Sequence, residues 1–337
     1  MKKLAILSIV FLSLLSCKDK KSNTETVTIN NVSEEMIPQK TLAEISIAQG
    51  GKWVDGTRGH KEYNGGTSFK NIDSLQVPKE HTDHTWFIRY EGPGWENSQV
   101  GYRIYLDWRN AIDIFGKKTD SLVLPYVGQD GFDSYHETAD WGQDILKAGK
   151  SMGIGGYGRI VVDTIVHFQT VDNTFVKIEN TDDNSSIKIT YEDWQTGDDI
   201  INLKSKLTIF PEDRFTKAQL TPSKEIKGLC TGIVNHGIPL QKKTGSKWAY
   251  IATYGIQTLA SPPDNLGMAL FYKLDEVVDQ KQGQHDHLVI FKPTTNPITY
   301  YFLGAWEQEL NGLKTEEAFI SDLNKKLEML DSSNSIN

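Results

Sequence analysis

Three consecutive segments of this chain alternate apolar and polar side chains with a period of two residues. They cover residues 160–169, 174–179 and 187–192, and turn-forming clusters at 172–173 and 182–185 separate them. A period of two places successive side chains on opposite faces of a strand, and a short polar cluster between two such runs favours a hairpin. The pattern therefore predicts an antiparallel β-meander.

Seven further runs are rich in β-branched and aromatic residues, which is typical of strands. They are residues 85–90, 100–108, 203–210, 248–253, 268–273, 287–291 and 299–305. One helix is predicted near the C-terminus, where Thr315 can act as N-cap and four apolar residues share one face. These four are Phe319, Leu323, Leu327 and Leu330. The elements together predict an all-β fold, a large antiparallel β-sandwich with a C-terminal helix.

The first 16 residues predict a lipoprotein signal peptide. Lys2 and Lys3 precede an apolar run at 4–15, which is shorter than the roughly 20 residues that a membrane-spanning helix needs. The run ends in Leu-Leu-Ser-Cys at 14–17, which has the form of a lipobox. We expect cleavage before Cys17 and lipidation of its thiol, so that lipid anchors the chain to the membrane of the bacterial cell envelope.

Residues 17–39 predict a flexible tether, because they are polar and contain no aromatic residue. Residues 40–337 contain no second linker and no internal repeat, and we expect them to form a single domain. The chain has 36 basic and 44 acidic residues; removal of Lys2 and Lys3 leaves 34 against 44, near −10. This balance argues against nucleic acid as a partner. Cys230 has no partner for a disulfide once Cys17 is lipidated.

The run at 100–108 continues into an unusually polar strand face. Tyr102, Ile104, Leu106 and Trp108 share one face, and Arg103, Tyr105, Asp107 and Arg109 share the other. Two interpretations stay open for the polar face. It is either a solvated surface with an arginine–aspartate ladder, or the floor of a cleft that holds an acidic sugar through bidentate arginine contacts.

A loop at 131–147 concentrates histidine, aromatic and acidic residues. Tyr135, His136, Asp140 and Trp141 suit a carbohydrate site, where aromatic rings stack on sugars and short polar groups bind hydroxyls. The glycine-rich run at 149–158 follows, but it lacks the spacing of a nucleotide-binding loop.

The remaining histidines allow several interpretations. His236 follows a predicted strand, at a rim where catalytic groups often lie, but a structural role is equally open. The pairs His285 with His287 and His81 with His84 can each begin a metal site. Because the spacing fixes no third ligand, we predict neither a metal nor another cofactor.

Three motifs carry a resemblance to a known family. They are Tyr-Glu-Gly-Pro-Gly-Trp-Glu at 90–96, Tyr-Arg-x-Tyr-Leu-Asp-x-Arg-Asn-Ala-x-Asp-Ile-Phe-Gly-Lys at 102–117, and Tyr-His-Glu-x-x-Asp-Trp-Gly-x-Asp-Ile-Leu-Lys at 135–147, with Trp306-Glu307 later. They resemble a bacterial lipoprotein family of formerly unknown function that occurs with polysaccharide-degradation genes, and the oligosaccharide dehydratases of ulvan breakdown. The resemblance covers residues 40–335 and implies a galactose-mutarotase-like β-sandwich.

The activity implied by the resemblance is elimination of water from a non-reducing-end glucuronate or iduronate of an anionic oligosaccharide, sulfated or unsulfated. Such a reaction needs a neutralised carboxylate, a base at C5 and an acid for the C4 hydroxyl. On chemical grounds, the candidates for proton transfer are His136, His236, Tyr135 and Tyr105. The candidates for substrate binding are Arg103, Arg109, Trp95, Trp141, Asp140 and Tyr102, although alternation places Tyr102 opposite the two arginines.

Two other classes of function stay open. A non-catalytic glycan-binding lipoprotein would use the same aromatic and arginine residues without the histidines. A sugar epimerase or mutarotase-like enzyme would also suit a sandwich with histidine and acidic groups, and fold alone does not decide between them.

Overall fold

The structure is a computed structural model that describes residues 39–66, 68–131 and 134–336. The expected signal peptide, Cys17 and the tether up to residue 38 lie outside the described residues. Residues 38–337 group into one unit. Strands predominate in it, every pairing between named strands is antiparallel, and one α-helix lies near the C-terminus, which confirms the predicted all-β sandwich class. No helix in the described part of the chain is long and apolar enough to cross a membrane.

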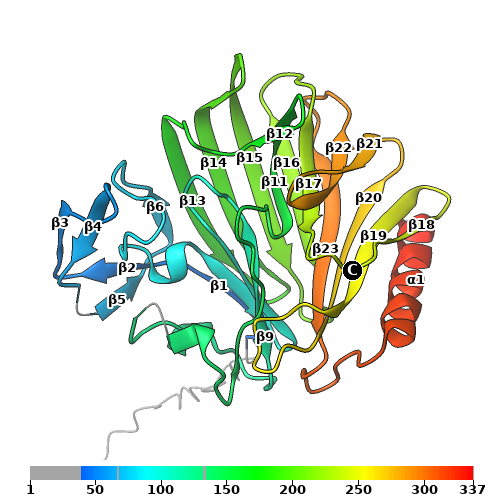
Figure 1. The fold of residues 1–337 in the computed structure, drawn as a ribbon, viewed down its shortest axis with the longest axis horizontal. Helices are drawn as coiled ribbons and strands as arrows, with labels where there is room; N and C mark the ends of the chain where they lie inside the picture. The colour runs from blue at the N-terminus through cyan, green and yellow to red at the C-terminus, as the bar shows by residue number, and fades with distance from the viewer. Residues whose placement is uncertain (1–38, 67, 132–133, 337) are drawn as a thin grey trace, which may run out of the picture. The chain divides into compact units, whose positions relative to one another are not determined.

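The largest sheet has nine strands (Figure 1). In spatial order they are β18 (Gln241–Thr244), β19 (Trp248–Ile256), β20 (Asn265–Lys273), β23 (Ile298–Trp306), β16 (Thr216–Pro222), β15 (Asp199–Ile209), β14 (Ser185–Thr196), β13 (Asn173–Asn180) and β6 (Ser74–Gln76). The strands β13, β14 and β15 form the predicted meander, with Val176 opposite Ile189 and Ile189 opposite Ser205. The period-two pattern therefore gave the correct element type in this region.

Two five-stranded sheets accompany it. One has the order β12 (Thr164–Val166), β11 (Ile154–Val161), β17 (Leu229–Val234), β22 (Asp286–Phe291) and β21 (Val277–Gln282). The other has the order β1 (Thr41–Glu44), β7 (Gly94–Asn97), β8 (Val100–Ile104), β9 (Ile112–Lys117) and β10 (Gly142–Asp144). Two small two-stranded sheets pair β2 (Ser46–Gln49) with β5 (Ser68–Asn71) and β3 (Lys52–Asp55) with β4 (Lys61–Asn64).

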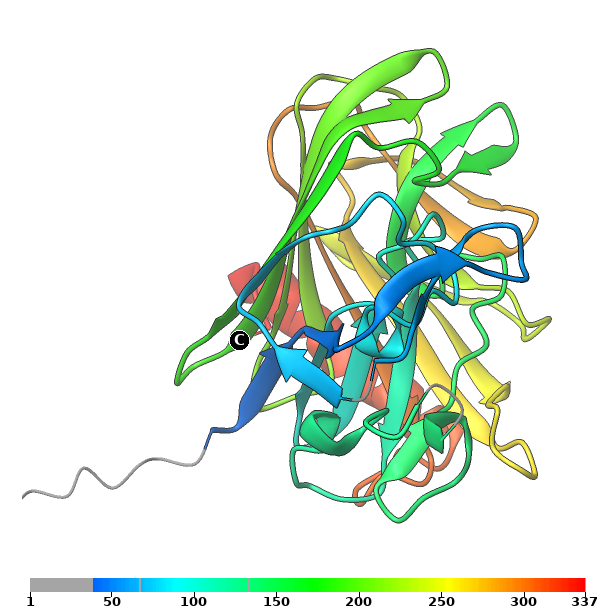
Figure 2. The ribbon, with the colours of Figure 1, turned by 90° about the vertical axis from the view of Figure 1, so that its left-hand side faces the viewer.

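The side chains of β23 point alternately into two hydrophobic cores, one on each face of the sheet. Tyr300 and Phe302 point into the main core between the sheets, which also contains Ile189 and Tyr102. Figure 2 shows the long green strands of the nine-stranded sheet and the teal strands of β8 and β9 as separate layers. The intervening residues of β23, such as Tyr301, face the helix instead. The nine-stranded sheet is thus buried on both faces at β19, β20 and β23, where apolar runs are nearly continuous, whereas β13, β14 and β15 alternate buried and exposed residues.

The helix α1 (Glu316–Ser333) covers the outer face of β19 and β20. The Thr315 side chain accepts a hydrogen bond from the backbone N–H of Ala318, and Glu316 and Glu317 lie in the first turn. Such a cap satisfies one of the free N–H groups at the helix start. The four predicted apolar residues of the helix are buried: Phe319, Leu323, Leu327 and Leu330.

Three strand predictions are wrong in detail. The strand predicted at 100–108 ends at Ile104, the last residue of β8. Residues 85–90 do not form a strand; the chain there turns into a short 3₁₀ helix, Arg89–Glu91. The backbone N–H of Leu106 donates to the carbonyl of Glu91, so the segment after β8 holds this turn in place. The predicted strand at 160–169 is divided between β11 and β12 by a turn at Val162.

Candidate functional site

The backbone between residues 84 and 110 is strained at five positions. Among the described residues, eight that are not glycine have a positive φ, and five of them lie in this short stretch. The five are His84 (58°), Trp86 (63°), Tyr90 (40°), Glu91 (69°) and Asn110 (49°). A side chain at positive φ costs energy, and such positions gather at functional sites because the surrounding structure must hold them there. The five positions therefore mark this region as a candidate functional site.

Arg103, on β8, lies at the centre of a buried polar cluster. One terminal nitrogen lies 2.5 Å from Asp144 Oδ2 and 3.1 Å from Asp113 Oδ2. The guanidinium also donates to the hydroxyl oxygens of Tyr105 at 2.9 Å and Tyr135 at 3.0 Å. The Arg103 side chain is only 2% exposed. We call these five residues the arginine cluster.

The strand register explains why these residues meet. Arg103 on β8 pairs directly with Asp113 on β9, so both side chains project from the same face of the sheet. On the next strand, Asp144 pairs with Phe115, which lies two residues beyond Asp113. A step of two residues returns to the same face. The cluster is thus built across β8, β9 and β10.

The two carboxylates of the arginine cluster share one small buried volume. Burial raises the pKa of Asp144 well above its ordinary value, Asp113 raises it further, and the positive charge of Arg103 opposes the shift. Burial also raises the pKa of Tyr105 well above its ordinary value. Asp144 and Tyr105 therefore keep their protons to a higher pH than exposed groups of the same types.

His136 lies at the edge of the arginine cluster. Its Nε2 is 3.6 Å from Asp144 Oδ2, and its ring lies 4.4 Å from the ring of Tyr135. The side chain of His136 is 33% exposed, whereas that of Asp144 is 1% exposed. A buried carboxylate behind a partly exposed imidazole is the arrangement that orients a histidine for proton transfer.

Arg109 forms a second group beside the first. Its guanidinium lies 2.5 Å from Asp107, 3.1 Å from Glu91 and 2.9 Å from Asp83, and it stacks 3.9 Å above the ring of Tyr105. Asp107 and Arg109 lie beyond the end of β8, so the predicted polar strand face is not a strand face there but a network of ion pairs. Glu91 Oε2 also lies 4.0 Å from Arg103, so Glu91 connects the two arginines.

Three residues of this network have the donors of a metal site. The ligand atoms of Asp83, His84 and Glu91 lie within 4.8 Å of one another. Carboxylate and imidazole donors suit a divalent cation. Arg109 already contacts both carboxylates and supplies positive charge there, so a cation at this point would compete with Arg109.

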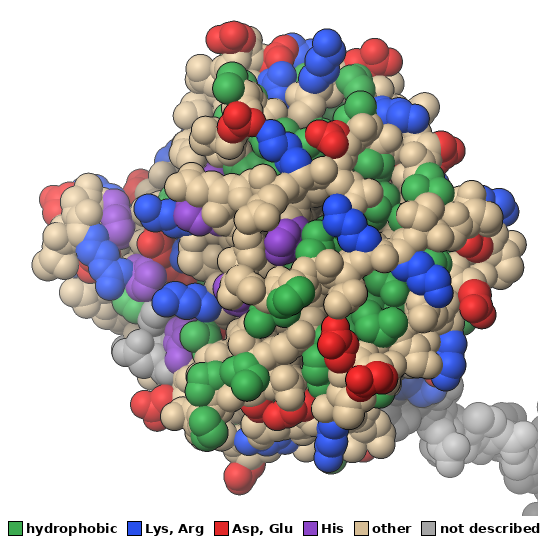
Figure 3. All heavy atoms as spheres, turned by 45° about the vertical axis from the view of Figure 1, so that its right-hand side comes forward, with side chains coloured by type: hydrophobic (Ala, Val, Ile, Leu, Met, Phe, Trp, Pro, Cys, Tyr) green, Lys and Arg blue, Asp and Glu red, His purple; other side chains and the backbone are tan. Residues whose placement is uncertain are grey.

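A pocket of about 590 Å³ lies beside the network. Tyr63, Phe69 and Trp86 contribute aromatic rings, and Glu91 belongs both to the pocket wall and to the network. Gly128, also in the wall, packs against Tyr135: a Cβ atom added to Gly128 would lie 3.2 Å from that ring. Figure 3 shows histidines gathered with basic and acidic side chains over part of the surface. We call this cavity the aromatic pocket; aromatic rings among polar groups suit sugar binding.

Two predicted substrate contacts are wrong, because Trp95 and Tyr102 are wholly buried in the main core. Their rings stack at 5.6 Å. Trp95 Nε1 donates to Thr216 Oγ1 at 2.8 Å, and the Tyr102 hydroxyl donates to the carbonyl of Arg214 at 2.6 Å. Both side chains lie on the core-facing side of the sheet, opposite to Arg103, and hold the sheets together.

Three other predicted residues lie outside the arginine cluster. Asp140 is exposed in the turn before β10. Trp141 is half-buried and packs edge-on against Phe115, whose ring in turn lies against Tyr135. His236 donates through Nε2 to the carbonyl of Lys147 at 2.9 Å, beyond the end of β10.

The sequence interpretation missed the acidic members of the site. Glu91, Asp113 and Asp144 each lie within a motif that was noticed, but none was singled out. Asp113 carried a usable signal: it is a carboxylate inside the apolar run Ala-Ile-Asp-Ile-Phe at 111–115. A charged group in a buried strand requires a partner. Nothing in the sequence pattern identified Tyr63 and Trp86 as pocket residues.

Comparison with protein families places these residues in a known sequence family. The model described as "Domain of unknown function (DUF4861)" matches residues 10–336, which include the whole arginine cluster and the aromatic pocket. This chain belongs to the DUF4861 family. No curated protein matches the chain. The matched range contains all the strands of the described residues and the helix α1.

Proposed function

We propose that this DUF4861 protein is a carbohydrate-active dehydratase. It would eliminate water from a non-reducing-end glucuronate or iduronate of an ulvan-type oligosaccharide and leave a 4,5-unsaturated uronate. The observation that carries the proposal is the position of His136. It is partly exposed, it is backed by the buried carboxylate of Asp144, and it lies at the edge of an arginine–tyrosine cluster.

The chemistry requires three groups around the sugar ring. The C5 proton lies α to the carboxylate and becomes acidic when the carboxylate charge is neutralised. A base removes that proton, and the C4 hydroxyl leaves as water when an acid protonates it. His136 is suited to proton transfer, because its imidazole is partly exposed and its Nε2 lies 3.6 Å from the buried carboxyl group of Asp144. Tyr135, whose ring lies 4.4 Å from that of His136, and Tyr105, which Arg103 contacts, are both buried and are the proposed second participants.

Arg109, and not Arg103, is the proposed partner of the substrate carboxylate. The Arg103 side chain is 2% exposed and is enclosed by the cluster, whereas that of Arg109 is 12% exposed. Among the carboxylates around Arg109, Asp83 is the most exposed, at 37% of its side chain. A uronate carboxylate would replace Asp83 at the outer side of the guanidinium and form a charge-assisted contact. Arg103 is therefore not proposed to contact the substrate, in contrast to the expectation from the sequence.

The aromatic pocket is the proposed site for the sugar rings. Its aromatic side chains offer apolar faces to a sugar, and Glu62, Asn64 and Glu91 offer acceptors and donors for hydroxyl groups. Because Glu91 joins the pocket to Arg109, a sugar in the pocket would place its acidic group next to that guanidinium.

The test mixes the purified full-length chain with oligosaccharides that end in a saturated glucuronate. Dehydration raises the ultraviolet absorbance of a conjugated C4–C5 double bond, with loss of one water by mass spectrometry and no cleavage. Two fragments would indicate a lyase, and a changed configuration without absorbance an epimerase or mutarotase-like enzyme. Binding of the oligosaccharide without any chemical change in it would indicate a non-catalytic glycan-binding lipoprotein.

We also propose that a lipid on Cys17 anchors the activity to the bacterial cell envelope, at the periplasmic or outer surface of the outer membrane. The support is the sequence of the leader and the Leu-Leu-Ser-Cys motif at 14–17. Metabolic labelling with a palmitate analogue tests it: the wild-type chain should be labelled and membrane-bound, and Cys17→Ser should be unlabelled. Labelling of Cys17→Ser to the wild-type level would refute the anchor.

A further inference from the structure

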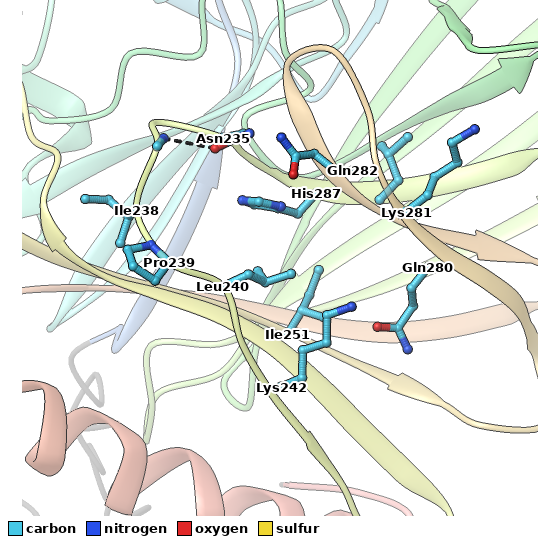
Figure 4. Close-up of a pocket in the computed structure, with 12 residues that line it drawn as sticks. Asn235, Ile238, Pro239, Leu240, Lys242, Ile251, Gln280, Lys281, Gln282 and His287 are labelled. Atoms are coloured by element: carbon cyan, nitrogen blue, oxygen red, sulfur yellow. Dashed lines mark hydrogen bonds between the residues drawn. The ribbon is translucent and has the colours of Figure 1, made fainter.

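A second pocket, of about 410 Å³, lies in another part of the fold (Figure 4). The loop after β17 and the strands β18, β19, β21 and β22 surround it. It shares no lining residue with the aromatic pocket. Its volume is in the range of sites for small molecules. We call it the His287 pocket.

His287 provides the main sign of a ligand. The residue is 7% exposed, and Figure 4 shows its imidazole extending from β22 into the space near Asn235, Ile238 and Leu240. Its Nε2 is buried and has no hydrogen-bond partner within the described structure. A buried polar atom without a partner costs free energy, so such atoms are rare unless a ligand or water satisfies them.

The charge of the wall favours an anion. The described residues that line the pocket include Lys242 and Lys281 but no Asp or Glu, although the whole chain has a net charge of −8. The Lys281 ammonium is engaged by Asp163 at 2.6 Å, which leaves Lys242 as the main positive group. Burial lowers the pKa of His287 and the charge of Lys242 lowers it further, so this ammonium lies within electrostatic reach of the imidazole.

The other side of the pocket is aliphatic. Ile238, Leu240 and Ile251 line it, and the described lining residues include no Phe, Tyr or Trp. Without an aromatic face, stacking on a sugar ring is not available. The ligand that matches both sides has an acidic head and an aliphatic body.

We infer that the His287 pocket binds a small amphipathic organic anion. Its carboxylate or sulfate group would accept hydrogen bonds from His287 Nε2–H and the Lys242 ammonium. Its aliphatic body would lie on Ile238, Leu240 and Ile251. The ion contacts are charge-assisted, and the burial of the aliphatic body adds apolar contact. This site is independent of the function proposed for the arginine cluster.

The test is a site-resolved titration of the full-length chain by NMR with ¹³C-labelled isoleucine methyl groups. The probes are sodium hexanoate, sodium hexyl sulfate and 1-hexanol, which share a six-carbon body. The Ile238 and Ile251 methyl signals should shift with an anion, and 1-hexanol should bind at least about tenfold more weakly. A response to hexanoate alone identifies a carboxylate site, to hexyl sulfate alone a sulfate site, and to both a general anion site.

Matched variants decide whether the named groups are responsible. Lys242→Gln and His287→Gln should each weaken binding about five- to tenfold. Lys243→Gln, on the next residue of β18, should leave it unchanged. Since Lys242 is exposed, its replacement tests the site even if His287→Gln fails to fold. No shift of the two methyl signals, equal binding of 1-hexanol, or full binding by Lys242→Gln would overturn the inference.

Discussion

The Nε2 atom of His136 lies 3.6 Å from Oδ2 of Asp144, the same oxygen that receives a hydrogen bond from Arg103. The imidazole at the edge of the site and the guanidinium in its interior are therefore coupled through one carboxylate. A change in the charge of Asp144 would alter both.

Loss of Arg103 should strongly destabilise the fold. Arg103→Met removes the one cation of the described residues that contacts both Asp113 and Asp144, and leaves two buried acidic groups without compensation. Breaking a buried ion pair on one side typically costs about 3–5 kcal/mol. Urea unfolding should show a loss of this order, and Arg58→Met, at an exposed position, should change stability by less than about 0.5 kcal/mol. Equal stabilities would show that Arg103 does not organise the cluster.

Trp86 should contribute to sugar binding. Its ring lines the aromatic pocket, and its removal takes away an apolar surface for a sugar ring. Trp86→Ala should weaken oligosaccharide binding about tenfold in calorimetric titration, which corresponds to about 1.4 kcal/mol. Tyr126→Ala is the matched control, because Tyr126 is exposed and is not part of the pocket wall. An equal effect of both changes would argue against the aromatic pocket as the sugar site.

Asp286 should make stability depend on pH. Burial raises the pKa of Asp286 to about 7, although the hydrogen bond from the Met152 N–H acts to lower it. In the unfolded chain the value is about 3.9. The folded state thus holds this proton more tightly, so the stabilising contribution is complete below about pH 4 and is lost as the pH rises toward 7.

The measurement compares the wild type with Asp286→Asn, whose amide cannot ionise. The stability of the wild type relative to the variant should fall by roughly 2–4 kcal/mol between pH 4 and pH 8. Other titrating groups cancel in the difference between the two proteins. A difference that stays constant over this range would mean that Asp286 titrates at its ordinary pKa.

Val162 should be a site where glycine stabilises the protein. It is exposed in the turn between β11 and β12 and has a φ of 54°, which is unfavourable for a β-branched residue. Val162→Gly should raise the free energy of unfolding by about 1 kcal/mol. Val278→Gly, at an exposed position in β21, should lower it instead. Destabilisation by Val162→Gly would indicate that the side chain makes compensating contacts.

The sequence predicted the parts of the fold that depend on local pattern. The meander of β13, β14 and β15 follows from alternation, and the buried face of α1 follows from its helical spacing. The division of 160–169 at Val162 was missed, because a turn residue with a β-branched side chain carries no turn signal.

The residues of the site that depend on local pattern were also predicted, and those that depend on strand pairing were not. Alternation placed Arg103 and Tyr105 on one face, and the structure brings them together with Tyr135 and His136. The partners Asp113 and Asp144 depend on the register of β8, β9 and β10, and register is set by pairing between strands and not by the pattern of one strand. Trp95 was misassigned because an aromatic residue suits a core as well as a sugar site.

The central claim is that His136 transfers a proton during removal of water from a terminal uronate. The most direct measurement follows ultraviolet absorbance and mass loss with a glucuronate-terminated oligosaccharide, for the wild type and for His136→Gln, after both are shown to bind the sugar. We predict that the wild type forms the unsaturated product and that His136→Gln loses at least about a hundredfold in rate. Full activity of His136→Gln, or binding by the wild type without loss of water, would contradict the claim.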